Sequence, residues 1–367
     1  MDSNAKPLKP RILVVDDEPF YLELLTDALS AHYTISVAKN GAQALRRAQG
    51  GARPDLILLD VMMPEMDGYE ACKHLKTNPL TEEIPVIFLT AMNEETNEVK
   101  GFELGAVDYI TKPISLPILH SRVQTQLAIS EQRIALEQLV RERTEQIERT
   151  KDAVVYSMGA LAEARDEETG NHVLRTREYV KALGYALAQR DNYRKQLSER
   201  TIHLISRAAP LHDIGKVGVP DKVLQKQGKL DDEERQLMNQ HVTLGRDAII
   251  SAERHIGATS FTSVAKEIAY CHHEKWDGSG YPQGLKGQQI PLSARMMALA
   301  DVYDALVSRR YYKPPMAHAD AQAMIVAERG THFDPDLVDA FISCSQAFHD
   351  IAERYRDEEE TTDTPLS

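Results

Sequence analysis

Histidine and carboxylate side chains recur through the C-terminal half of the sequence. The set comprises Glu168, His172, His212, Asp213, His241, His272, His273 and Asp301. One histidine beside one carboxylate is common in proteins without a metal, because the two groups form a hydrogen bond. Five histidines with several carboxylates and no cysteine among them are instead typical of a site for a divalent transition ion such as Fe, Mn, Ni, Co or Zn. The set predicts a metal centre without thiolate ligands.

Spacing within this set suggests how the ligands would be shared. Glu168 and His172 are four residues apart, so on one helix their side chains would lie on the same face. The adjacent His272 and His273 would point about 100° apart on a helix and cannot share a face. These two histidines would therefore reach two different ions, or one ion and a neighbouring side chain.

Asp213 is the natural bridging ligand, because it adjoins His212 and offers one oxygen to each of two ions. Two ions about 3.5–4 Å apart clamp the attacking and leaving oxygens of an in-line phosphoryl displacement. Lys216, three residues beyond Asp213, would place its ammonium group on a phosphate oxygen; without the other residues it would be an ordinary helix-surface lysine. These residues predict phosphoryl chemistry, with Asp213 and Lys216 as catalytic residues.

A second polar group lies in the N-terminal part of the chain, where short apolar runs each end in a polar residue. Its members are Asp16, Asp17, Asp60, Thr90 and Lys112. Parallel strands bring their carboxyl ends to one edge of a sheet, so these side chains would lie together. One such carboxylate alone would serve equally well as a helix cap. Three carboxylates together suit Mg²⁺, and the hydroxyl and ammonium groups suit a bound phosphoryl group.

The elements that must position these residues follow from the hydrophobic pattern. Buried strands are predicted for RILVVDD, YTISVA, DLILLD, IPVIFLT and DYITKP, with helices over residues 18–31, 42–49, 69–76 and 94–104. Strands that alternate with helices require right-handed crossovers and a parallel sheet covered on both faces. Residues 10–125 are therefore expected to form a doubly wound α/β domain.

The pattern changes after this domain. Residues 115–150 contain no glycine and carry apolar residues along one side, which predicts a long linker helix. Its apolar stripe would be buried in a coiled-coil homodimer or against the chain's own domains, and its spacing drifts from a strict heptad. Residues 151–355 are expected to form an all-helical domain. The acidic segment 356–367 is expected to be a disordered tail.

Composition limits the classes of protein and partner. The length of 367 residues predicts two or three domains. Three widely spaced cysteines fit no disulfide framework, and neither a signal peptide nor an apolar run long enough to cross a membrane is evident, which together favour the cytoplasm. The formal net charge of −13 argues against binding a nucleic acid polymer or an anionic membrane. A small phosphorylated ligand could still bind in a local basic pocket.

The motifs VVDDEP, LLDVMMPEMDGYE, FLTA and DYITKP resemble the receiver domain of bacterial two-component response regulators. The resemblance implies a flavodoxin-like fold in which Asp60 accepts a phosphoryl group from a cognate sensor histidine kinase. It also implies a cis Lys112–Pro113 bond, which costs little only before proline. The implied Mg²⁺ and phosphoryl site consists of Asp16, Asp17, Thr90 and Lys112, and the implied switch residues are Thr90 and Tyr109.

The motifs HDIGK, HHEKWDGSGYPQGLKGQQIP and ADVYDAL resemble the HD-GYP subgroup of the HD superfamily of metal-dependent phosphohydrolases, over residues 155–350. The resemblance implies hydrolysis of cyclic di-GMP, with Lys216 on the substrate phosphate and Glu168 as the ligand that admits a third ion. The implied ligands of the two ions are His172, His212, Asp213, His241, His272, His273 and Asp301. Arg310 and Lys313 match positions that bind the ligand's guanine or phosphate, although a solvated surface pair fits them equally well.

The glycines of GSGYPQG do not indicate a nucleoside triphosphate site. This segment has neither a preceding strand nor the Gly-Lys-Ser/Thr ending of a phosphate-binding loop. Its glycines and Pro282 would instead shape a fixed loop beside the histidines, with Trp276 and Tyr281 as packing anchors. The family resemblance implies that this loop can dock diguanylate cyclase domains.

The sequence thus predicts a response regulator whose phosphorylation at Asp60 controls metal-dependent hydrolysis of cyclic di-GMP to pGpG, GMP or both. Two alternatives stay open. One is a sensor or docking protein that binds cyclic di-GMP or a cyclase without hydrolysis. The other is a hydrolase that prefers linear pGpG or another cyclic dinucleotide.

Overall fold

The computed structural model describes residues 9–91, 101–165, 170–308 and 315–356. The chain forms two compact units, Met1–Thr144 and Glu145–Ser367. Glu168, Arg310, Lys313 and residues 357–367 lie outside the described residues, as does most of the helix expected over residues 94–104.

The first unit contains a five-stranded parallel sheet with the strand order β2-β1-β3-β4-β5. The strands are β1 Arg11–Val15, β2 Thr34–Ala38, β3 Leu56–Asp60, β4 Val86–Ala91 and β5 Asp108–Lys112. All five predicted strands are present, and β3 is buried throughout because helices cover both of its faces. The predicted doubly wound α/β fold is confirmed.

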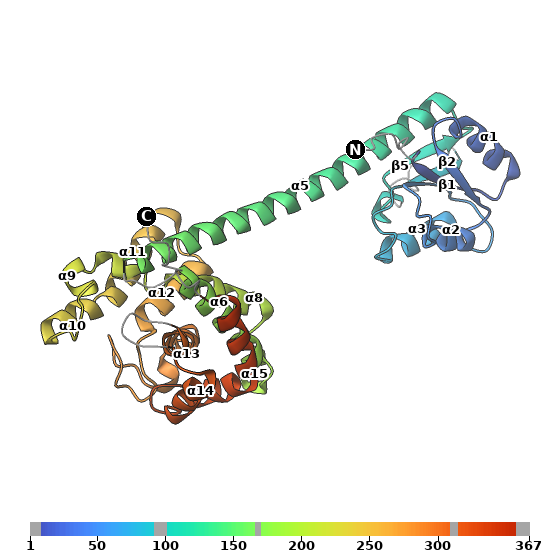
Figure 1. Ribbon diagram of the computed structural model, residues 1–367. Helices are drawn as coiled ribbons and strands as arrows, with labels where there is room; N and C mark the ends of the chain where they lie inside the picture. Colours follow the sequence, from blue (N-terminus) through green and yellow to red (C-terminus); the bar gives the residue numbers. More distant parts are fainter. Residues whose placement is uncertain (1–8, 92–100, 166–169, 309–314, 357–367) are drawn as a thin grey trace, which may run out of the picture. The chain divides into compact units, whose positions relative to one another are not determined.

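Helices pack on both faces of this sheet, as Figure 1 shows. On one face, α1 (Pro19–Leu29) and the start of α5 bury apolar side chains such as Leu25 and Leu119 against β1 and β3. On the other face, α2 (Gly41–Ala48) and α3 (Gly68–Thr77) bury Ala44 and Leu75. The side chain of Asp67 caps α3 by accepting a hydrogen bond from the Glu70 N–H at 2.7 Å.

The long helix α5 runs from Leu116 to Glu163, a length of 48 residues. The expected end near residue 150 is wrong. Gly159 lies within the helix, and a Cβ atom there would stand 2.5 Å from the Pro210 carbonyl oxygen. Glycine at this position allows close packing between two segments, and the tertiary contact outweighs its low helix propensity.

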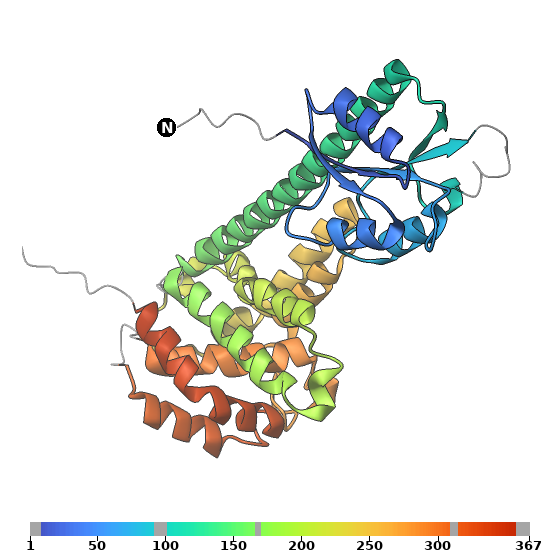
Figure 2. The ribbon, with the colours of Figure 1, turned by 90° about the vertical axis from the view of Figure 1, so that its right-hand side faces the viewer.

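The second unit is helical, as predicted, and its helices are coloured from green to red in Figures 1 and 2. Its elements after α5 are α6 Gly170–Ala188, α7 Asp191–Arg194, α8 Glu199–Ala208, η1 Ala209–Leu211, η2 Ile214–Gly218, α9 Asp221–Leu224, α10 Asp232–Asn239, α11 His241–Ile256, α12 Ser260–Cys271, η3 Gly287–Gln289, α13 Leu292–Val307, α14 His318–Ala327 and α15 Pro335–Arg354. One core joins α6, α8, α13 and α15 through side chains that include Tyr179, Ile202, Tyr303 and Phe348.

Candidate metal centre and phosphoacceptor site

Three histidines of the second unit are oriented by backbone carbonyl groups three or four residues earlier in the chain. His212 Nδ1 lies 3.0 Å from the Ala209 carbonyl oxygen, His241 Nδ1 lies 2.7 Å from that of Met238, and His272 Nδ1 lies 2.9 Å from that of Ile268. A carbonyl oxygen only accepts, so Nδ1 carries the proton in each ring. The Nε2 lone pair of each histidine is thereby left for a metal ion.

Asp213 lies between two groups of these nitrogens. Its Oδ1 atom is 3.2 Å from His241 Nε2 and 3.4 Å from His272 Nε2. Its Oδ2 atom is 3.4 Å from His212 Nε2 and 2.8 Å from Lys216 Nζ. The two oxygens of one carboxylate therefore face two different places where an ion could bind.

The residues on the Oδ2 side form a second cluster. His172 Nε2 and His212 Nε2 are 3.5 Å apart, and Asp301 Oδ1 is 3.7 Å and 3.9 Å from these two atoms, respectively. Glu163 Oε2 is 3.9 Å from His172 Nε2. Glu163 could not be predicted from the sequence, because no spacing rule connects it to these histidines. Its presence here follows from the extension of α5.

Asp304 is a further residue that was not predicted, although it stands in ADVYDAL three residues after Asp301. Its Oδ2 atom accepts a hydrogen bond from His172 Nδ1 at 2.8 Å, and Arg175 donates to both of its oxygens at 2.7 and 3.0 Å. Burial works to raise the pKa of Asp304, but His172 and Arg175 outweigh burial and lower it. The ionised carboxylate holds the His172 ring with Nε2 toward the cluster.

The adjacent histidines His272 and His273 lie in one cluster. Asp213, His241, His272 and His273 each place a ligand atom within 4.8 Å of the others. Helix α12 ends at Cys271, so His272 and His273 stand in the segment that leaves the helix, and their ring centres are 4.0 Å apart. The sequence left open two different ions, or one ion and a neighbouring side chain; the geometry instead brings both rings beside a single ion position.

The loop after these histidines is held from within. Glu274 is buried and accepts hydrogen bonds from the backbone N–H groups of Gln283 at 2.7 Å and Leu285 at 3.0 Å. Tyr281 stacks on His273 with ring centres 4.9 Å apart, so the predicted anchoring role of Tyr281 is confirmed. A Cβ atom at Gly280 would lie 2.3 Å from the Lys275 nitrogen, which requires glycine there.

The polar atoms at Asp213 fit a bound cation. Among the described residues, the buried atoms Asp213 Oδ1, His241 Nε2 and His272 Nε2 have no hydrogen-bond partner. Leaving such an atom unsatisfied costs about 1–3 kcal/mol, so buried polar atoms normally have a partner. A cation placed among the three would satisfy them all.

The ionisation of these groups also suits a metal. Burial works to raise the pKa of Asp213, but the Lys216 ammonium and His212 outweigh it and hold this pKa well below its usual range. Burial, and then the neighbouring His272, hold the pKa of His273 well below its usual range. An ionised carboxylate and a neutral imidazole are the forms that bind metal ions.

The first unit brings its acidic residues together at the carboxyl edge of the sheet. Asp16, Asp17 and Asp60 place ligand atoms within 4.8 Å of one another. Lys112 Nζ is 2.9 Å from Asp16 Oδ2 and 3.1 Å from Asp60 Oδ1. Burial and then the charge of Asp16 raise the pKa of Asp60 to about 6, against an opposing effect of Lys112.

The remaining residues of this site lie on the adjoining strands. Thr90 is the penultimate residue of β4, beside β5, and its hydroxyl group donates to the Ala91 carbonyl oxygen at 3.3 Å. Tyr109 lies in β5 with Phe102 and the Arg122 guanidinium against its ring. The Lys112–Pro113 peptide bond is cis, which confirms that prediction.

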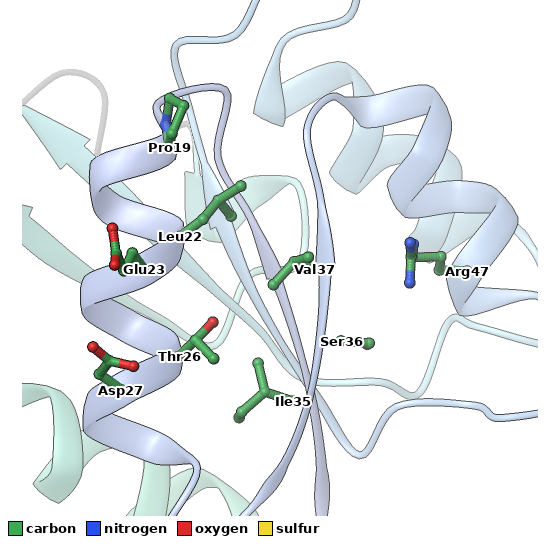
Figure 3. Close-up of a pocket in the computed structure, with 9 residues that line it drawn as sticks. All are labelled: Pro19, Leu22, Glu23, Thr26, Asp27, Ile35, Ser36, Val37 and Arg47. Atoms are coloured by element: carbon green, nitrogen blue, oxygen red, sulfur yellow. The ribbon is translucent and has the colours of Figure 1, made fainter.

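A hollow of 560 Å³ lies between α1 and β2 in the same unit, as Figure 3 shows. Leu22, Ile35 and Val37 give it an apolar lining, while Glu23 and Arg47 supply opposite charges. None of the acidic residues at the carboxyl edge lines this hollow, so it is separate from that acidic cluster. No helix among the described residues is both long and apolar enough to cross a membrane.

Comparisons with known proteins match both units. The response regulator receiver domain matches residues 12–124, and the HD domain matches residues 157–337. The chain is 52% identical over 357 residues to a probable cyclic di-GMP phosphodiesterase of Vibrio cholerae, covering 95% of this chain and 80% of the relative. It is 37% identical over 350 residues to the cyclic di-GMP phosphodiesterase response regulator RpfG of Xanthomonas campestris, covering 93% and 89% of the two chains.

A shorter match covers about half of the chain. The 3'3'-cGAMP-specific phosphodiesterase 2 of Vibrio cholerae is 42% identical over 193 residues, which are 53% of this chain and 34% of that protein. HD domains are a metal-dependent family, and a receiver domain implies a kinase as partner. Both domains occur here in one chain, and the two long matches extend over nearly all of it. The chain therefore belongs to the family of response regulators that join a receiver domain to an HD domain, together with these phosphodiesterases.

Proposed function

We propose that the chain is a metal-dependent phosphodiesterase that hydrolyses cyclic di-GMP. The observation that carries this proposal is Asp213, whose two oxygens face two separate groups of ligand atoms. The substrate class comes from the relatives that match nearly the whole chain. A cyclic dinucleotide contains two phosphodiester groups. A pair of metal ions can catalyse hydrolysis of such a group by stabilising its attacking and leaving oxygens.

The metal ligands fall into two sets that share Asp213. One set consists of His241, His272 and His273, and the other of His172, His212 and Asp301. Two divalent ions bound there would polarise a phosphodiester and lower the pKa of a water molecule. The nitrogen and carboxylate ligands suit Mn, Fe, Ni, Co or Zn, and Glu168 would serve a third ion.

Lys216 acts on the substrate rather than on a metal. Its ammonium group is 2.8 Å from Asp213 Oδ2 and largely buried. We expect it to neutralise Asp213 before the ions bind, and to contact a phosphate oxygen once they take over that carboxylate. Arg310 and Lys313 are proposed to bind a guanine base or the second phosphate.

A chromatographic time course of cyclic di-GMP tests the reaction. Purified protein is loaded with Mn²⁺, Fe²⁺ or Ni²⁺, and a variant with both His212→Ala and Asp213→Ala is treated in parallel. Appearance of pGpG or GMP with the wild type alone supports the proposal. Equal turnover by the double variant, after its metal content is shown to be depleted, would reject the assigned centre.

Two other functions are separated by the same assay. A hydrolase for a different cyclic dinucleotide is favoured by the match to a 3'3'-cGAMP-specific phosphodiesterase, and faster turnover of 3'3'-cGAMP would support it. Turnover of linear pGpG alone would indicate a second-step hydrolase. Binding of cyclic di-GMP without any product, at full metal occupancy, would indicate a sensor.

Phosphorylation is proposed to control this activity. Asp60 would accept the phosphoryl group from a sensor histidine kinase in the cytoplasm, with Mg²⁺ held by Asp16 and Asp17. Lys112 would contact the phosphoryl group, as its position within 3.1 Å of Asp60 Oδ1 supports. Thr90 and Tyr109 would report the change to the rest of the receiver unit.

Two protein contacts complete the proposal. We expect a homodimer through α5, because Val140, Ile147, Val154 and Leu161 recur every seven residues and are each more than half exposed. We expect diguanylate cyclase domains to dock on the loop after His273, where Pro282 and Gln283 are exposed and the backbone is held by Glu274.

A further inference from the structure

Glu163 is the last residue of α5 and one of the most buried charged residues of the chain. Its exposed fraction is 1%, and its Oε2 atom lies 3.9 Å from His172 Nε2. A buried carboxylate is expensive unless a cation or several donors compensate its charge. The compensating group must therefore be sought among its neighbours.

The spacing of those neighbours is that of ligands around one ion. Ligand atoms of Glu163, His172 and His212 all lie within 4.8 Å of one another. The separation of 3.9 Å from His172 Nε2 is too long for a hydrogen bond. Two atoms that each stand about 2.1 Å from the same ion are separated by about 3–4 Å. Glu163 Oε2 meets this condition with His172 Nε2, as does Asp301 Oδ1 at 3.7 Å.

The end of α5 is also fixed to the segment that carries His212. Gly159 packs on the carbonyl group of Pro210, two residues before His212. Earlier on α5 than Gly159, Glu148 and Asp152 both pair with the Arg207 guanidinium. These contacts hold the helix end at the metal centre independently of any ion.

We propose that Glu163 is a ligand of the ion bound by His172 and His212. This inference rests on the proposed metal centre and adds a ligand to it that comes from the linker helix. Because α5 is continuous from Leu116 to Glu163, the ion ties the end of this helix to the centre. A change in the position or rotation of α5 would then alter the affinity for that ion.

Metal titration of the full chain tests the assignment without relying on turnover. Protein stripped with a chelator is titrated with Mn²⁺ in competition with a chromophoric chelator, for wild type, Glu163→Gln and Glu145→Gln. Glu145 is on the same helix with its side chain 60% exposed, so its variant is the matched control. We expect Glu163→Gln to weaken one binding event by at least about tenfold, and Glu145→Gln to change neither event.

Two further variants separate loss of a ligand from misfolding, and Glu163 from Glu168, the proposed ligand of a third ion. In Glu163→Cys loaded with Co²⁺, a thiolate-to-cobalt charge-transfer band beyond that of the wild type is expected only if residue 163 touches the ion. Glu168→Gln is titrated in parallel. Unchanged Mn²⁺ affinity in folded Glu163→Gln, together with no new band in Glu163→Cys, overturns the inference. If His212→Ala also leaves metal binding unchanged, the proposed centre itself fails.

Discussion

At the scale of single residues, Asp304 decides which nitrogen of His172 faces the cluster. Asp304→Asn would keep the shape but remove the charge that balances Arg175 and fixes the His172 ring. We expect metal affinity to fall by about 10–100-fold, because partners of metal-bound histidines have effects of this size. Breaking a buried charge pair also costs about 3–5 kcal/mol of unfolding free energy. Chelator competition and thermal unfolding measure the two effects.

A surface carboxylate is the control for this substitution. Asp320→Asn removes an exposed carboxylate from α14 and should leave both metal affinity and unfolding unchanged. Wild-type metal affinity in a folded Asp304→Asn protein would show that Asp304 does not orient His172.

Asp60 gives a prediction on pH. Its pKa is raised to about 6 in the folded chain from an ordinary value of 3.8, so the folded state binds its proton more tightly than the unfolded state. When Asp60 is protonated, it does not lower the free energy of unfolding. Its ionisation in the folded state lowers this free energy as pH rises from about 4 to 6, and the loss is complete above pH 6. At about 1.4 kcal/mol per pH unit, reduced by solvent screening, this cost is about 1–3 kcal/mol.

Asp60→Asn should therefore stabilise the receiver unit by about 1–3 kcal/mol at pH 7.5 in the presence of EDTA, and by little near pH 4. EDTA is needed because Mg²⁺ would favour the ionised carboxylate. Chemical denaturation at both pH values measures the difference, with Asp27→Asn on the exposed side of α1 as control. A gain that is equal at the two pH values would contradict the raised pKa.

At the scale of elements, the loop after His273 depends on one buried carboxylate. Glu274 uses one oxygen for the Gln283 N–H and the other for the Leu285 N–H. Glu274→Gln replaces one acceptor with a donor, so one backbone N–H loses its partner at a cost of about 1–3 kcal/mol. We expect faster hydrogen exchange at Gln283 or Leu285, and weaker positioning of Tyr281 on His273.

Hydrogen exchange followed by mass spectrometry of peptides from this loop measures the effect. Glu233→Gln, an exposed change at the start of α10, should leave these peptides unchanged. Equal protection of the loop in Glu274→Gln and wild type would mean that the loop is stable without both hydrogen bonds to Glu274.

The exposed side of α5 carries the dimer prediction. Val140 and Ile147 are 57% and 53% exposed, and Val154 and Leu161 continue the seven-residue interval. β-Branched residues at such positions favour two-stranded coiled coils. Ile147→Asp should therefore shift the protein from dimer to monomer in analytical ultracentrifugation. Gln138→Asp, on the opposite side of the helix, should leave the dimer intact. A wild-type protein that is monomeric at micromolar concentration would refute dimerisation through α5.

The sequence could predict those features that depend on local spacing. His212 and Asp213 are adjacent in the sequence, so their closeness is given directly. Asp60 and Lys112 end strands of one parallel sheet, so they are expected at the same edge. Glu163 could not be assigned in this way, because its approach to His172 depends on tertiary packing. The extension of α5 past residue 150 likewise depends on tertiary packing, because Gly159 admits the Pro210 carbonyl group, which local propensity does not reveal.

At the scale of the whole molecule, one helix extends from the receiver unit to the candidate metal centre. It begins with side chains such as Leu119 in the core of the receiver unit and ends with Glu163 beside His172. A phosphoryl group at Asp60 can influence the metal centre only by changing an equilibrium that both sites share. We expect the position of α5 to be governed by such an equilibrium, because each end of the helix is packed in a different unit.

Thermodynamic linkage makes the coupling between phosphorylation at Asp60 and metal affinity testable, because each must change the other equally. If phosphorylation changes the position of α5, beryllium fluoride with Mg²⁺, which imitates a phosphoryl group on Asp60, should change the affinity of the HD unit for Co²⁺. A coupling of about 1–3 kcal/mol corresponds to a change of about 5–150-fold. Competition titration with Co²⁺, with and without beryllium fluoride, measures it in the full chain.

Two variants identify the route of this effect. Asp60→Ala lacks the proposed phosphoacceptor and should show no response to beryllium fluoride, while the proposed metal centre stays intact. Glu163→Gln keeps the phosphoacceptor and should show a reduced response, because the helix no longer contributes a ligand. A full response in Glu163→Gln that Asp60→Ala abolishes would mean that phosphorylation reaches the metal centre through the packing of Gly159 and Arg207 instead. A response that persists in Asp60→Ala would show that the effect does not arise at the receiver site.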